Sequence, residues 1–392
     1  MSKVSIEKCP DYETANINRA LIKTFNNLGG VGKYIKPGMR VALKPNLVMR
    51  KKPAEAATTN PSVVQALASV IKEQGAKAII VESPGGLYTK SALKGVYSIC
   101  GIEEAAQKSG AELNYDTAEV EVKNPEGAIL KNLTLIKPLM DADLIINLPK
   151  LKTHGQMVYT GAVKNMFGAV AGARKAEYHF RISEYKRFAD ALIDIFLGVK
   201  PALNIMDAVT GMEGNGPTAG NARNIGLVIA SEDAFSLDFA ALNIIGADPF
   251  AVPLIAQAAQ RGLCPQSLGE MDIVGEQISS VRISGFDIPQ LESLRDIQFF
   301  NNKLFKGIMS YIKPRPVFNY ALCIGCAECA RNCPARIITM KNSKPGLELS
   351  KCIRCFCCQE LCPAKAVEIK RSPLLKFLIK NKKVNRKEDF KA

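Results

Sequence analysis

Eight cysteines near the carboxyl end of this 392-residue chain have a spacing that is typical of metal-cluster ligands. They form two runs of C-x2-C-x2-C-x3-C, and a proline follows each run. The runs consist of Cys323, Cys326, Cys329 and Cys333, and of Cys352, Cys355, Cys358 and Cys362. Every cysteine of the first run has its counterpart 29 positions later, so the segment is an internal duplication whose period the cysteines set.

The spacing also predicts which cysteines share a metal cluster. A tight C-x2-C-x2-C loop supplies three thiolates to one 4Fe-4S cluster, whereas the fourth cysteine, which precedes the proline, ligates the other cluster. The predicted ligands of cluster 1 are Cys323, Cys326, Cys329 and Cys362, and those of cluster 2 are Cys352, Cys355, Cys358 and Cys333. With these features, residues 317–371 resemble the bacterial two-cluster ferredoxins, and the resemblance implies a small α+β domain that transfers electrons.

Two other uses of these cysteines fit the sequence less well. Structural zinc takes four ligands in paired C-x2-C spacing, and eight cysteines in two longer runs exceed that requirement. A disulfide framework needs an oxidising compartment, to which nothing in the chain points. Cys357 is a spare thiol beside a predicted ligand; it is an alternative ligand or, as we expect, a half-buried bystander.

The composition of the whole chain limits the classes of protein to which it belongs. Its length suits two or three domains, and an apolar share of 47% predicts a globular protein with a substantial core. The N-terminus has no apolar signal segment and no stretch reaches 18 apolar residues, so we expect a cytoplasmic protein without a membrane span. The net charge of +15 favours anionic substrates, lipids or partners. Nucleic acid is not expected, because the chain has no nucleic-acid-binding motif.

Short apolar strands alternate with helical patterns through residues 1–290. This alternation predicts an α/β domain with a mostly parallel sheet and helices on both faces. The expected strands are 41–44, 78–81, 111–115, 144–148, 202–206 and 225–230, with a hairpin at 118–136 and a last pair near 271–284. The expected helices are 60–74, 101–109, 182–198, 234–245 and 250–261.

Polar and glycine-rich segments follow four of the predicted strands. Ligands of open α/β sheets bind beyond the carboxyl ends of the strands, so these segments predict a substrate site. Its candidate residues are Lys44, Asn46, Lys150, Lys152, His154, Lys164, Asn165, Asp207, Glu213, Gly214 and Gly216.

Lys150, Lys152 and His154 occupy alternate positions, so in an extended chain all three side chains point the same way. Together with Lys164 and Asn165 they suit a phosphate or a carboxylate, and we expect an anionic small-molecule ligand. Lys152 and His154 are also the candidate catalytic residues, His154 as a general acid or base or as an oriented hydrogen-bond donor. The alternative is a solvated basic loop.

The glycines of the segment 211–217 would let the backbone approach a ligand closely. In the same region, Asp207 and Glu213 are candidate ligands of a divalent cation, although a tight structural loop explains both residues equally well. The segment is neither a Walker A loop nor G-x-G-x-x-G, so nothing supports nucleotide binding. His179 lies in a charged stretch that predicts a solvated helical face.

Four motifs in residues 1–290 resemble the family called domain of unknown function 362. They are VALKPN (41–46), DLIINLPKLKTHGQMVYTGAVKNMFG (143–168), NIMDAVTGMEGNGPTAG (204–220) and AFSLDFAALNIIG (234–246). The resemblance implies this family's α/β domain, which is often joined to a two-cluster ferredoxin segment, but it implies no reaction. At the level of the fold, the domain is also similar to the cofactor-binding half of lactate-racemase-type proteins, which does not determine function.

The expected organisation is an α/β domain at 1–290, a linker helix at 291–316, a ferredoxin-like domain at 317–371 and a basic tail at 372–392. One face of the linker helix is apolar, and we expect it to dock the ferredoxin-like domain onto the α/β domain rather than to lie on a membrane surface. The residues of this face are Phe300, Leu304, Phe305, Ile308 and Ile312.

Two functions therefore fit the sequence. The first is a redox enzyme, in which two 4Fe-4S clusters exchange electrons with an anionic substrate held in the α/β domain. The second is an electron carrier or assembly module, in which the α/β domain docks a partner protein and binds no substrate of its own. Both functions require a redox partner protein.

Overall fold

The computed structural model describes residues 1–289 and 313–370. The chain divides into two units, Met1–Pro289 and Gln290–Ala392. The predicted apolar face of the linker and the predicted basic tail lie outside the described residues. Of the expected linker helix at 291–316 only the last four residues are described, and a strand begins there, at Arg315.

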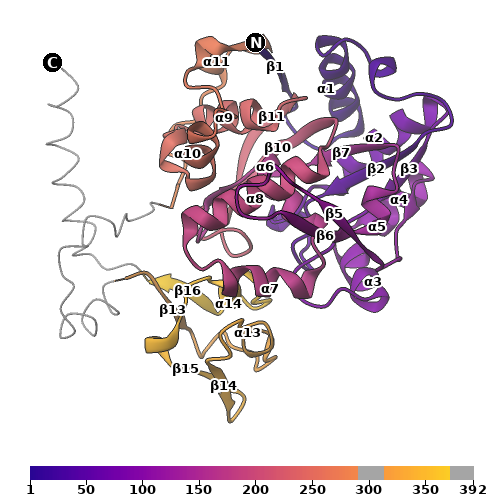
Figure 1. Ribbon diagram of the computed structural model, residues 1–392. Coiled ribbons are helices and arrows are strands. Elements are labelled where there is room, and N and C mark those ends of the chain that lie inside the picture. The colour runs from indigo at the N-terminus through magenta and orange to yellow at the C-terminus, as the bar shows by residue number, and fades with distance from the viewer. Residues whose placement is uncertain (290–312, 371–392) are drawn as a thin grey trace, which may run out of the picture. The chain divides into compact units, whose positions relative to one another are not determined.

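A ten-stranded mixed sheet forms the centre of the large unit, within the described residues (Figure 1). Its strand order is β12-β1-β11-β10-β7-β2-β3-β4, and β8 and β9 extend it beside β10. The strands are β1 (Ser2–Lys8), β2 (Arg40–Pro45), β3 (Lys77–Ile80), β4 (Glu112–Leu113), β7 (Leu144–Leu148), β8 (Lys150–His154), β9 (Val158–Thr160), β10 (Leu203–Glu213), β11 (Asn221–Ser231) and β12 (Met271–Gly275). Most neighbours are parallel; only β11 with β1 and β10, and β8 with β9, are antiparallel. The predicted α/β class with a mostly parallel sheet is thereby confirmed.

Helices cover both faces of this sheet. On one face lie α1 (Thr14–Asn27), α2 (Pro61–Glu73), α3 (Lys90–Ile99) and α4 (Ile102–Ser109), and on the other lie α6 (Ala162–Asn165), α8 (Tyr185–Val199), α9 (Ala234–Ile244) and α10 (Pro253–Gln260). The remaining helices are α5 (Lys137–Met140), α7 (Gly172–Arg181) and α11 (Ile278–Val281), and a hairpin joins β5 (Glu119–Lys123) to β6 (Asn132–Ile136). Of the two strands predicted near 271–284, the first is β12, but the second is wrong, because the helix α11 forms there instead.

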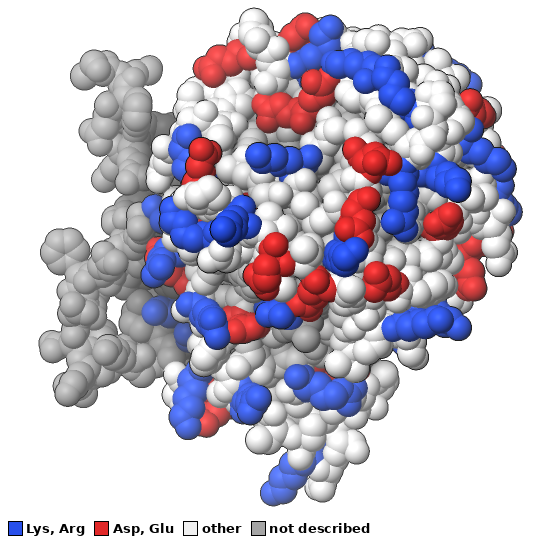
Figure 2. All heavy atoms as spheres, turned by 45° about the vertical axis from the view of Figure 1, so that its right-hand side comes forward, with Lys and Arg blue, Asp and Glu red and all other residues white. Residues whose placement is uncertain are grey.

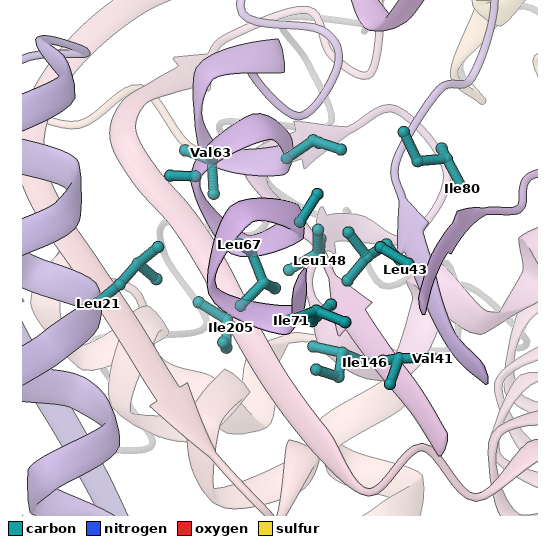
Figure 3. Packing of buried hydrophobic residues seen from close by; sticks show 14 of the residues in the cluster. Leu21, Val41, Leu43, Val63, Leu67, Ile71, Ile80, Ile146, Leu148 and Ile205 are labelled. Atoms are coloured by element: carbon teal, nitrogen blue, oxygen red, sulfur yellow. The ribbon is translucent and has the colours of Figure 1, made fainter. Parts of the chain in front are cut away.

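One apolar core fills the space between α1, α2 and the sheet (Figure 3). Along α2, Val63, Leu67 and Ile71 recur at every fourth position, so they form one buried stripe of the helix. This stripe packs against alternate residues of the strands, such as Leu43 of β2 and Ile146 of β7. Because strand side chains alternate between faces, the intervening residues of β2 and β7 face α6 on the other side.

The predicted helix at 60–74 shows how local sequence sets the ends of an element. Asn60 is the N-cap of α2, and its side chain accepts a hydrogen bond of 2.9 Å from the backbone N–H of Ser62. Pro61 follows at the first helical position, where no N–H is needed. Gly75, just beyond the last turn, has a φ of 73°, which glycine adopts without strain.

The small unit repeats its backbone at the same 29-residue offset as its cysteines. Its elements are β13 (Arg315–Phe318), α13 (Glu328–Arg331), β14 (Ile338–Lys341), β15 (Lys344–Leu347), α14 (Cys357–Glu360) and β16 (Val367–Lys370). Positive φ angles occur at equivalent places in the two halves, at 325 and 354, at 327 and 356, and at 336 and 365. The strands cross-pair: β13 of the first half pairs with β16 of the second, and β14 of the first pairs with β15 of the second. The halves are therefore interleaved rather than packed as two separate lobes.

Charged side chains of both signs are interspersed over the face of the described residues drawn in Figure 2. The net charge of +15 is thus not gathered into one uniformly basic area on this face. No helix among the described residues is both long and apolar enough to cross a membrane.

Candidate functional site

The small unit contains two cavities of similar size, and each is lined by four cysteines. One cavity is lined by Cys323, Cys326, Cys329 and Cys362, and the other is lined by Cys333, Cys352, Cys355 and Cys358. These are the two sets that the sequence analysis assigned to clusters 1 and 2. The remaining walls are mainly apolar, with Phe318 and Met340 at the first cavity and Ile337 and Phe356 at the second.

The crossed strand pairing positions the fourth cysteine of each set. Cys362 lies five positions before the start of β16, and β16 pairs with β13, which ends five positions before Cys323. Cys362 is therefore carried from the second half to the cavity of the first half. By the same pairing of β14 with β15, Cys333 reaches the cavity of the second half.

The cavities fit an iron–sulfur cluster better than a single ion. Among residues 1–289 and 313–370, no three Cys, His, Asp or Glu side chains lie close enough together to hold one metal ion. The cysteines instead surround a volume, as thiolates around a cube of iron and sulfide do. Burial raises the pKa of Cys329 and Cys358, so binding a cluster to these thiols would release protons.

Cys357 is buried rather than half-buried, and it does not line the second cavity. Its side chain is hydrogen-bonded to that of Cys355, which does line it. This hydrogen bond and burial raise the pKa of Cys357, and the same hydrogen bond lowers the pKa of Cys355.

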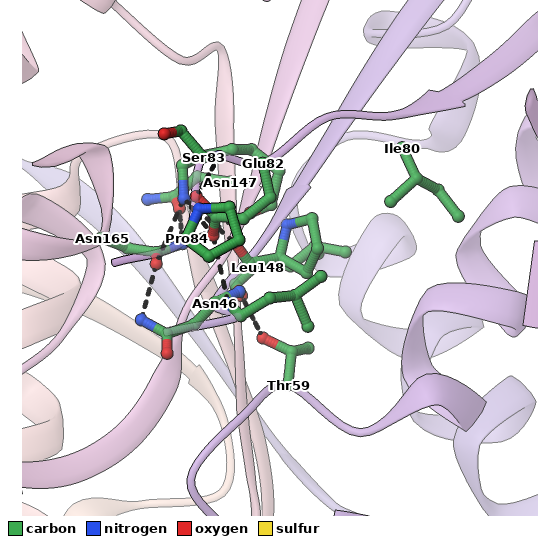
Figure 4. Close-up of polar contacts among 12 residues, drawn as sticks. Asn46, Thr59, Ile80, Glu82, Ser83, Pro84, Asn147, Leu148 and Asn165 are labelled. Atoms are coloured by element: carbon green, nitrogen blue, oxygen red, sulfur yellow. Dashed lines mark hydrogen bonds and ion pairs between the residues drawn. The ribbon is translucent and has the colours of Figure 1, made fainter. Parts of the chain in front are cut away.

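A buried polar centre lies at the carboxyl ends of β2 and β7 in the large unit (Figure 4). The ammonium of Lys44 lies 2.9 Å from a carboxylate oxygen of Glu82, and both side chains are buried. Glu82 also accepts hydrogen bonds from the backbone N–H groups of Leu47 and Ser83, at 3.1 and 2.8 Å. Burial lowers the pKa of Lys44, whereas Glu82 acts to raise it.

Asn46, Asn147 and Asn165 extend the hydrogen-bond network of this polar centre. Asn165 of α6 accepts a hydrogen bond of 2.8 Å from Asn46 and donates one of 2.7 Å to Asn147. Lys152 of β8 donates to Asn46 at 2.7 Å and to the backbone carbonyl of Ala57 at 2.6 Å. Residues from four separate parts of the chain are thus joined through Asn46 and Asn165.

Lys150, in contrast, has an acidic partner of its own. Its ammonium lies 2.7 Å from Asp207 and 2.8 Å from the hydroxyl of Tyr12, which donates to Asp207 at 2.9 Å. Asp207 also accepts the backbone N–H of Asn60 at 2.9 Å. These hydrogen bonds connect β10 to the start of α2, so Lys150 and Asp207 stabilise the fold.

His154, Lys152, Lys164 and His179 form a buried basic cluster. The Nδ1 atom of His154 accepts the backbone N–H groups of Gln156 and Met157, at 3.1 and 3.2 Å, so the neutral ring carries its hydrogen on Nε2. Burial lowers the pKa of His154 strongly, and the positive charges of Lys164 and Lys152 lower it further. A positive potential therefore acts on the Nε2–H donor.

The prediction that His179 lies on a solvated face is wrong. His179 is buried and stacks on Phe188, with ring centroids 4.5 Å apart, and Phe167 meets it edge-on. Burial, with a smaller contribution from Lys164, lowers its pKa to about 3. The charged neighbours in the sequence concealed this position, because Arg174, Glu177 and Arg181 are exposed and lie away from His179 on α7.

Three further expectations for the large unit need correction. Lys44 and Lys150 already pair with buried carboxylates, so they are not available to a bound anion. Asp207 and Glu213 do not form a cation site, because they are six residues apart along β10, about 20 Å, and Asp207 is paired with Lys150. Gly216 lies against Thr153 and its carbonyl accepts the N–H of Gly155, so this glycine allows close packing on β8 rather than the approach of a ligand.

Glu82 and Asp238 are buried acids on either side of α6 that the sequence analysis did not identify. Glu82 lies in a segment after a strand, and the only signal for it was the polar residue in that place. Asp238 is the single acid in the apolar helix α9, and that isolation is the signal that could have identified it. Asp238 accepts the backbone N–H groups of Ala162 and Val163, at 2.7 and 3.1 Å, and burial raises its pKa to about 7.

Comparison with known proteins bears on both units. Residues 41–243 match the model of a domain of unknown function (DUF362), and residues 315–363 match that of a 4Fe-4S dicluster domain. The chain is also 36% identical over 270 residues to the thylakoid-associated protein sll1697 of Synechocystis sp., a match that covers 68% of this chain and 81% of that protein. The fold and the cysteine-lined cavities define an iron–sulfur protein with an α/β unit and a dicluster unit. The chain belongs to the DUF362 family.

Likeness to solved structures is weaker. The lactate racemase apoprotein from Thermoanaerobacterium thermosaccharolyticum matches at a TM-score of 0.37 and 11% identity, over 60% of this chain and 55% of that one. A protein of Thermotoga maritima matches at 0.35 and 13%, over 58% and 57%. The chain thus spans little more than half the length of either structure.

Proposed function

We propose that the eight cysteines around the two cavities bind two 4Fe-4S clusters and that the protein transfers single electrons. Two four-cysteine cavities of nearly equal size are the observation that carries this proposal. In it, Cys323, Cys326, Cys329 and Cys362 hold cluster 1, and Cys333, Cys352, Cys355 and Cys358 hold cluster 2. When bound, such clusters accept and donate one electron at a time. The mainly apolar walls lower the polarity around the cysteine sulfurs, which helps to tune the potential of a bound cluster.

Pairs of substitutions test the crossed ligand sets. Iron and sulfide analysis of the anaerobically purified chain should give about eight of each. Cys323→Ala with Cys362→Ala removes two ligands of one cluster, so about four irons should remain. Cys323→Ala with Cys333→Ala removes one ligand from each cluster, so almost no iron should remain. If the first pair empties both sites and the second empties one, the ligands are not crossed.

We further propose that the electrons serve a redox reaction on an anionic substrate bound near Lys152, His154 and Lys164. The support is the buried positive potential at the Nε2–H of His154, which a phosphate or carboxylate would compensate. Lys44 and Lys150 take no part in this revised site. His154 would act as an oriented hydrogen-bond donor, because burial disfavours its protonated form.

Anaerobic native mass spectrometry of the purified protein tests for such a substrate. A retained small anion supports the redox enzyme, and Lys152→Met or His154→Gln should weaken its binding by about 30- to 150-fold, or 2–3 kcal/mol. Iron content should stay at about eight per chain in both variants. A protein that retains no anion, and that binds neither phosphate nor small carboxylates, would instead be an electron carrier whose α/β unit docks a partner protein.

We also propose where in the cell the protein meets its redox partner. The twelve cysteines form no disulfide, which suits a reducing cytoplasm. The relative from Synechocystis sp. is named a thylakoid-associated protein. By analogy, the redox partner of this chain would lie at a membrane surface. Fractionation of native cells, with and without a high-salt wash of the membranes, would separate the two locations.

A further inference from the structure

Three large apolar side chains are exposed beside the first cysteine-lined cavity of the small unit. Tyr320, Leu322 and Ile324 have exposed fractions of 53%, 51% and 69%, and they lie at alternate positions around Cys323. Ile324 also lines the cavity, so its side chain contacts both solvent and the space that the four cysteines surround. Apolar side chains that are exposed as a group, rather than singly, mark a contact site on a protein surface. Residues 320–324 are called the apolar loop below.

Hydrogen bonds hold the apolar loop in place. The ammonium of Lys344 donates to the backbone carbonyl oxygens of Tyr320 and Cys323, at 2.7 and 3.0 Å. The hydroxyl of Tyr320 donates to the backbone carbonyl oxygen of Pro345 at 3.1 Å. The loop is therefore ordered before any partner binds, so that binding loses little conformational entropy there.

Basic side chains lie at the edge of the apolar loop. Lys341 and Lys344 are opposite each other near the tip of the β14–β15 hairpin, and both are exposed. This tip packs on the loop, because a Cβ added to Gly325 would lie 3.0 Å from it. The acid that lines the same cavity, Glu328, is ion-paired with Arg331. A surface with an apolar centre and a basic edge is complementary to an acidic surface with an apolar centre.

The second half of the small unit has no equivalent surface among its described residues. The residues that correspond to Tyr320, Leu322 and Ile324, 29 positions later, are Leu349, Lys351 and Ile353. Only the charged residue of these three is exposed, and the two apolar residues are half-buried. The exposed apolar surface is therefore a property of one half, and it lies beside one cavity.

We propose that the apolar loop is the docking surface for an acidic redox partner protein, and that single electrons pass there between the partner and cluster 1. This inference rests on the proposed function, in which Cys323, Cys326, Cys329 and Cys362 hold that cluster. Electron transfer slows steeply with distance, and at Ile324 one side chain separates solvent from the cavity. For each electron that the partner gains, cluster 1 loses one. A membrane surface also suits apolar and basic side chains, but lipid exchanges no electrons.

An exchange of equivalent residues in the full chain tests the docking surface. The probe is an acidic blue-copper protein, a one-electron acceptor that loses its colour on reduction. Calorimetry of the two oxidised proteins at low ionic strength measures binding alone, and stopped-flow absorbance measures electron transfer from the reduced chain. Leu322→Lys should weaken binding and slow electron transfer by about 10- to 30-fold, because it places a charge in the apolar centre. Lys351→Leu, the reverse exchange in the second half, is the matched control and should change either by less than about 3-fold.

General electrostatic attraction predicts the opposite pattern. An added lysine would then strengthen binding to the acidic protein, and the loss of Lys351 would weaken it. That pattern, equal effects of the two substitutions, or no binding by the unsubstituted chain would overturn the inference. So would anionic lipid vesicles that bind the chain but not Leu322→Lys, if binding of the copper protein is the same in both.

Hydroxyl-radical footprinting identifies what covers the apolar loop. Tyr320 and Leu322 should be oxidised in the free chain and protected once the copper protein is bound. Protection already present in the free chain would overturn the inference, because another part of this chain or a second copy would then cover the loop. Iron should stay at about eight per chain in both variants. Iron missing from the unsubstituted protein would instead refute the proposed function.

Discussion

Buried charges in the large unit are arranged as separate pairs, each with its own hydrogen bonds. Lys44 pairs with Glu82 beside α6, and Lys150 pairs with Asp207 beside α2. A buried pair contributes little net stability over apolar residues of the same size, but removing one partner leaves the other charge uncompensated. The cost of such a removal is what distinguishes these residues from surface lysines.

Lys44→Met should therefore lower the free energy of unfolding by about 3–5 kcal/mol, because Glu82 would remain buried without its counter-charge. Lys3→Met is the matched control, since Lys3 lies 3.8 Å from Asp272 and both side chains are about half exposed. The control should change the free energy by less than about 1 kcal/mol. Anaerobic urea unfolding followed by circular dichroism measures both, and equal effects would argue against the buried pair.

The neutral state of His179 predicts a pH dependence of stability. Its pKa is about 3 in the folded chain and about 6.5 in an unfolded one, so below pH 6.5 only the unfolded chain takes up the proton. The stability that His179 contributes is present above pH 6.5 and is lost as the pH falls toward 3. His179→Phe, which keeps a ring on Phe188, should remove about 1.4 kcal/mol of the loss between pH 7.5 and 5.5. Identical losses in both proteins, measured by urea unfolding, would contradict a buried neutral His179.

Short elements of the large unit owe their placement to glycines that lie against buried polar groups. Gly168 follows α6, and a methyl group at its Cβ position would overlap both Glu82 and Lys44. Gly161, just before α6, lies in the same way against Asp238. The two glycines thus hold α6 close to charged partners on either side of it.

Gly168→Ala should cost about 1–3 kcal/mol of stability, because the ion pair or the backbone must move to admit the methyl group. Gly32→Ala is the control, since a Cβ at residue 32 would meet no atom within 4 Å and its φ is not positive. The control should be neutral or slightly stabilising. Thermal unfolding of the three proteins checks the difference, and a neutral Gly168→Ala would show that the pair has room to adapt.

At the scale of the whole molecule, the two units have cores of different kinds. The core of the large unit is built from aliphatic and aromatic side chains of α1, α2, α4 and the sheet. In the described part of the small unit, the buried core is a few aliphatic residues together with Cys329, Cys358 and Cys362. The small unit therefore depends on whatever its cysteines bind, since metal-binding energy in such domains is folding energy.

Removal of iron and sulfide by acid and a chelator, followed by return to neutral pH, should unfold the small unit alone. Hydrogen exchange measured by mass spectrometry should then show peptides of residues 313–370 exchanging as rapidly as an unfolded chain. Peptides of β2 and β7 should keep their protection, because their core holds no cluster. Protection of residues 313–370 that survives the loss of iron would contradict this dependence.

Local patterns in the sequence determined much of this protein. The period-two alternation of the strands, the Asn60-Pro61 start of α2 and its Gly75 end all depend on neighbours within a few residues, so they could be predicted. The spacing of the cysteines is likewise local, and it named the same two sets that line the two cavities. The family resemblance in both units was also carried by contiguous motifs.

Only the tertiary structure decided which charges meet. Glu82 is 38 residues from Lys44, and Asp207 is 57 residues from Lys150, so nothing in the local sequence pairs them. His179 appeared solvated because its neighbours in α7 are charged, yet the rings of Phe167 and Phe188 bury it. The order of the strands, with two antiparallel neighbours of β11 in a mostly parallel sheet, brought these distant residues together. Pairing at such separations depends on how whole elements pack, and for that reason only the folded chain reveals it.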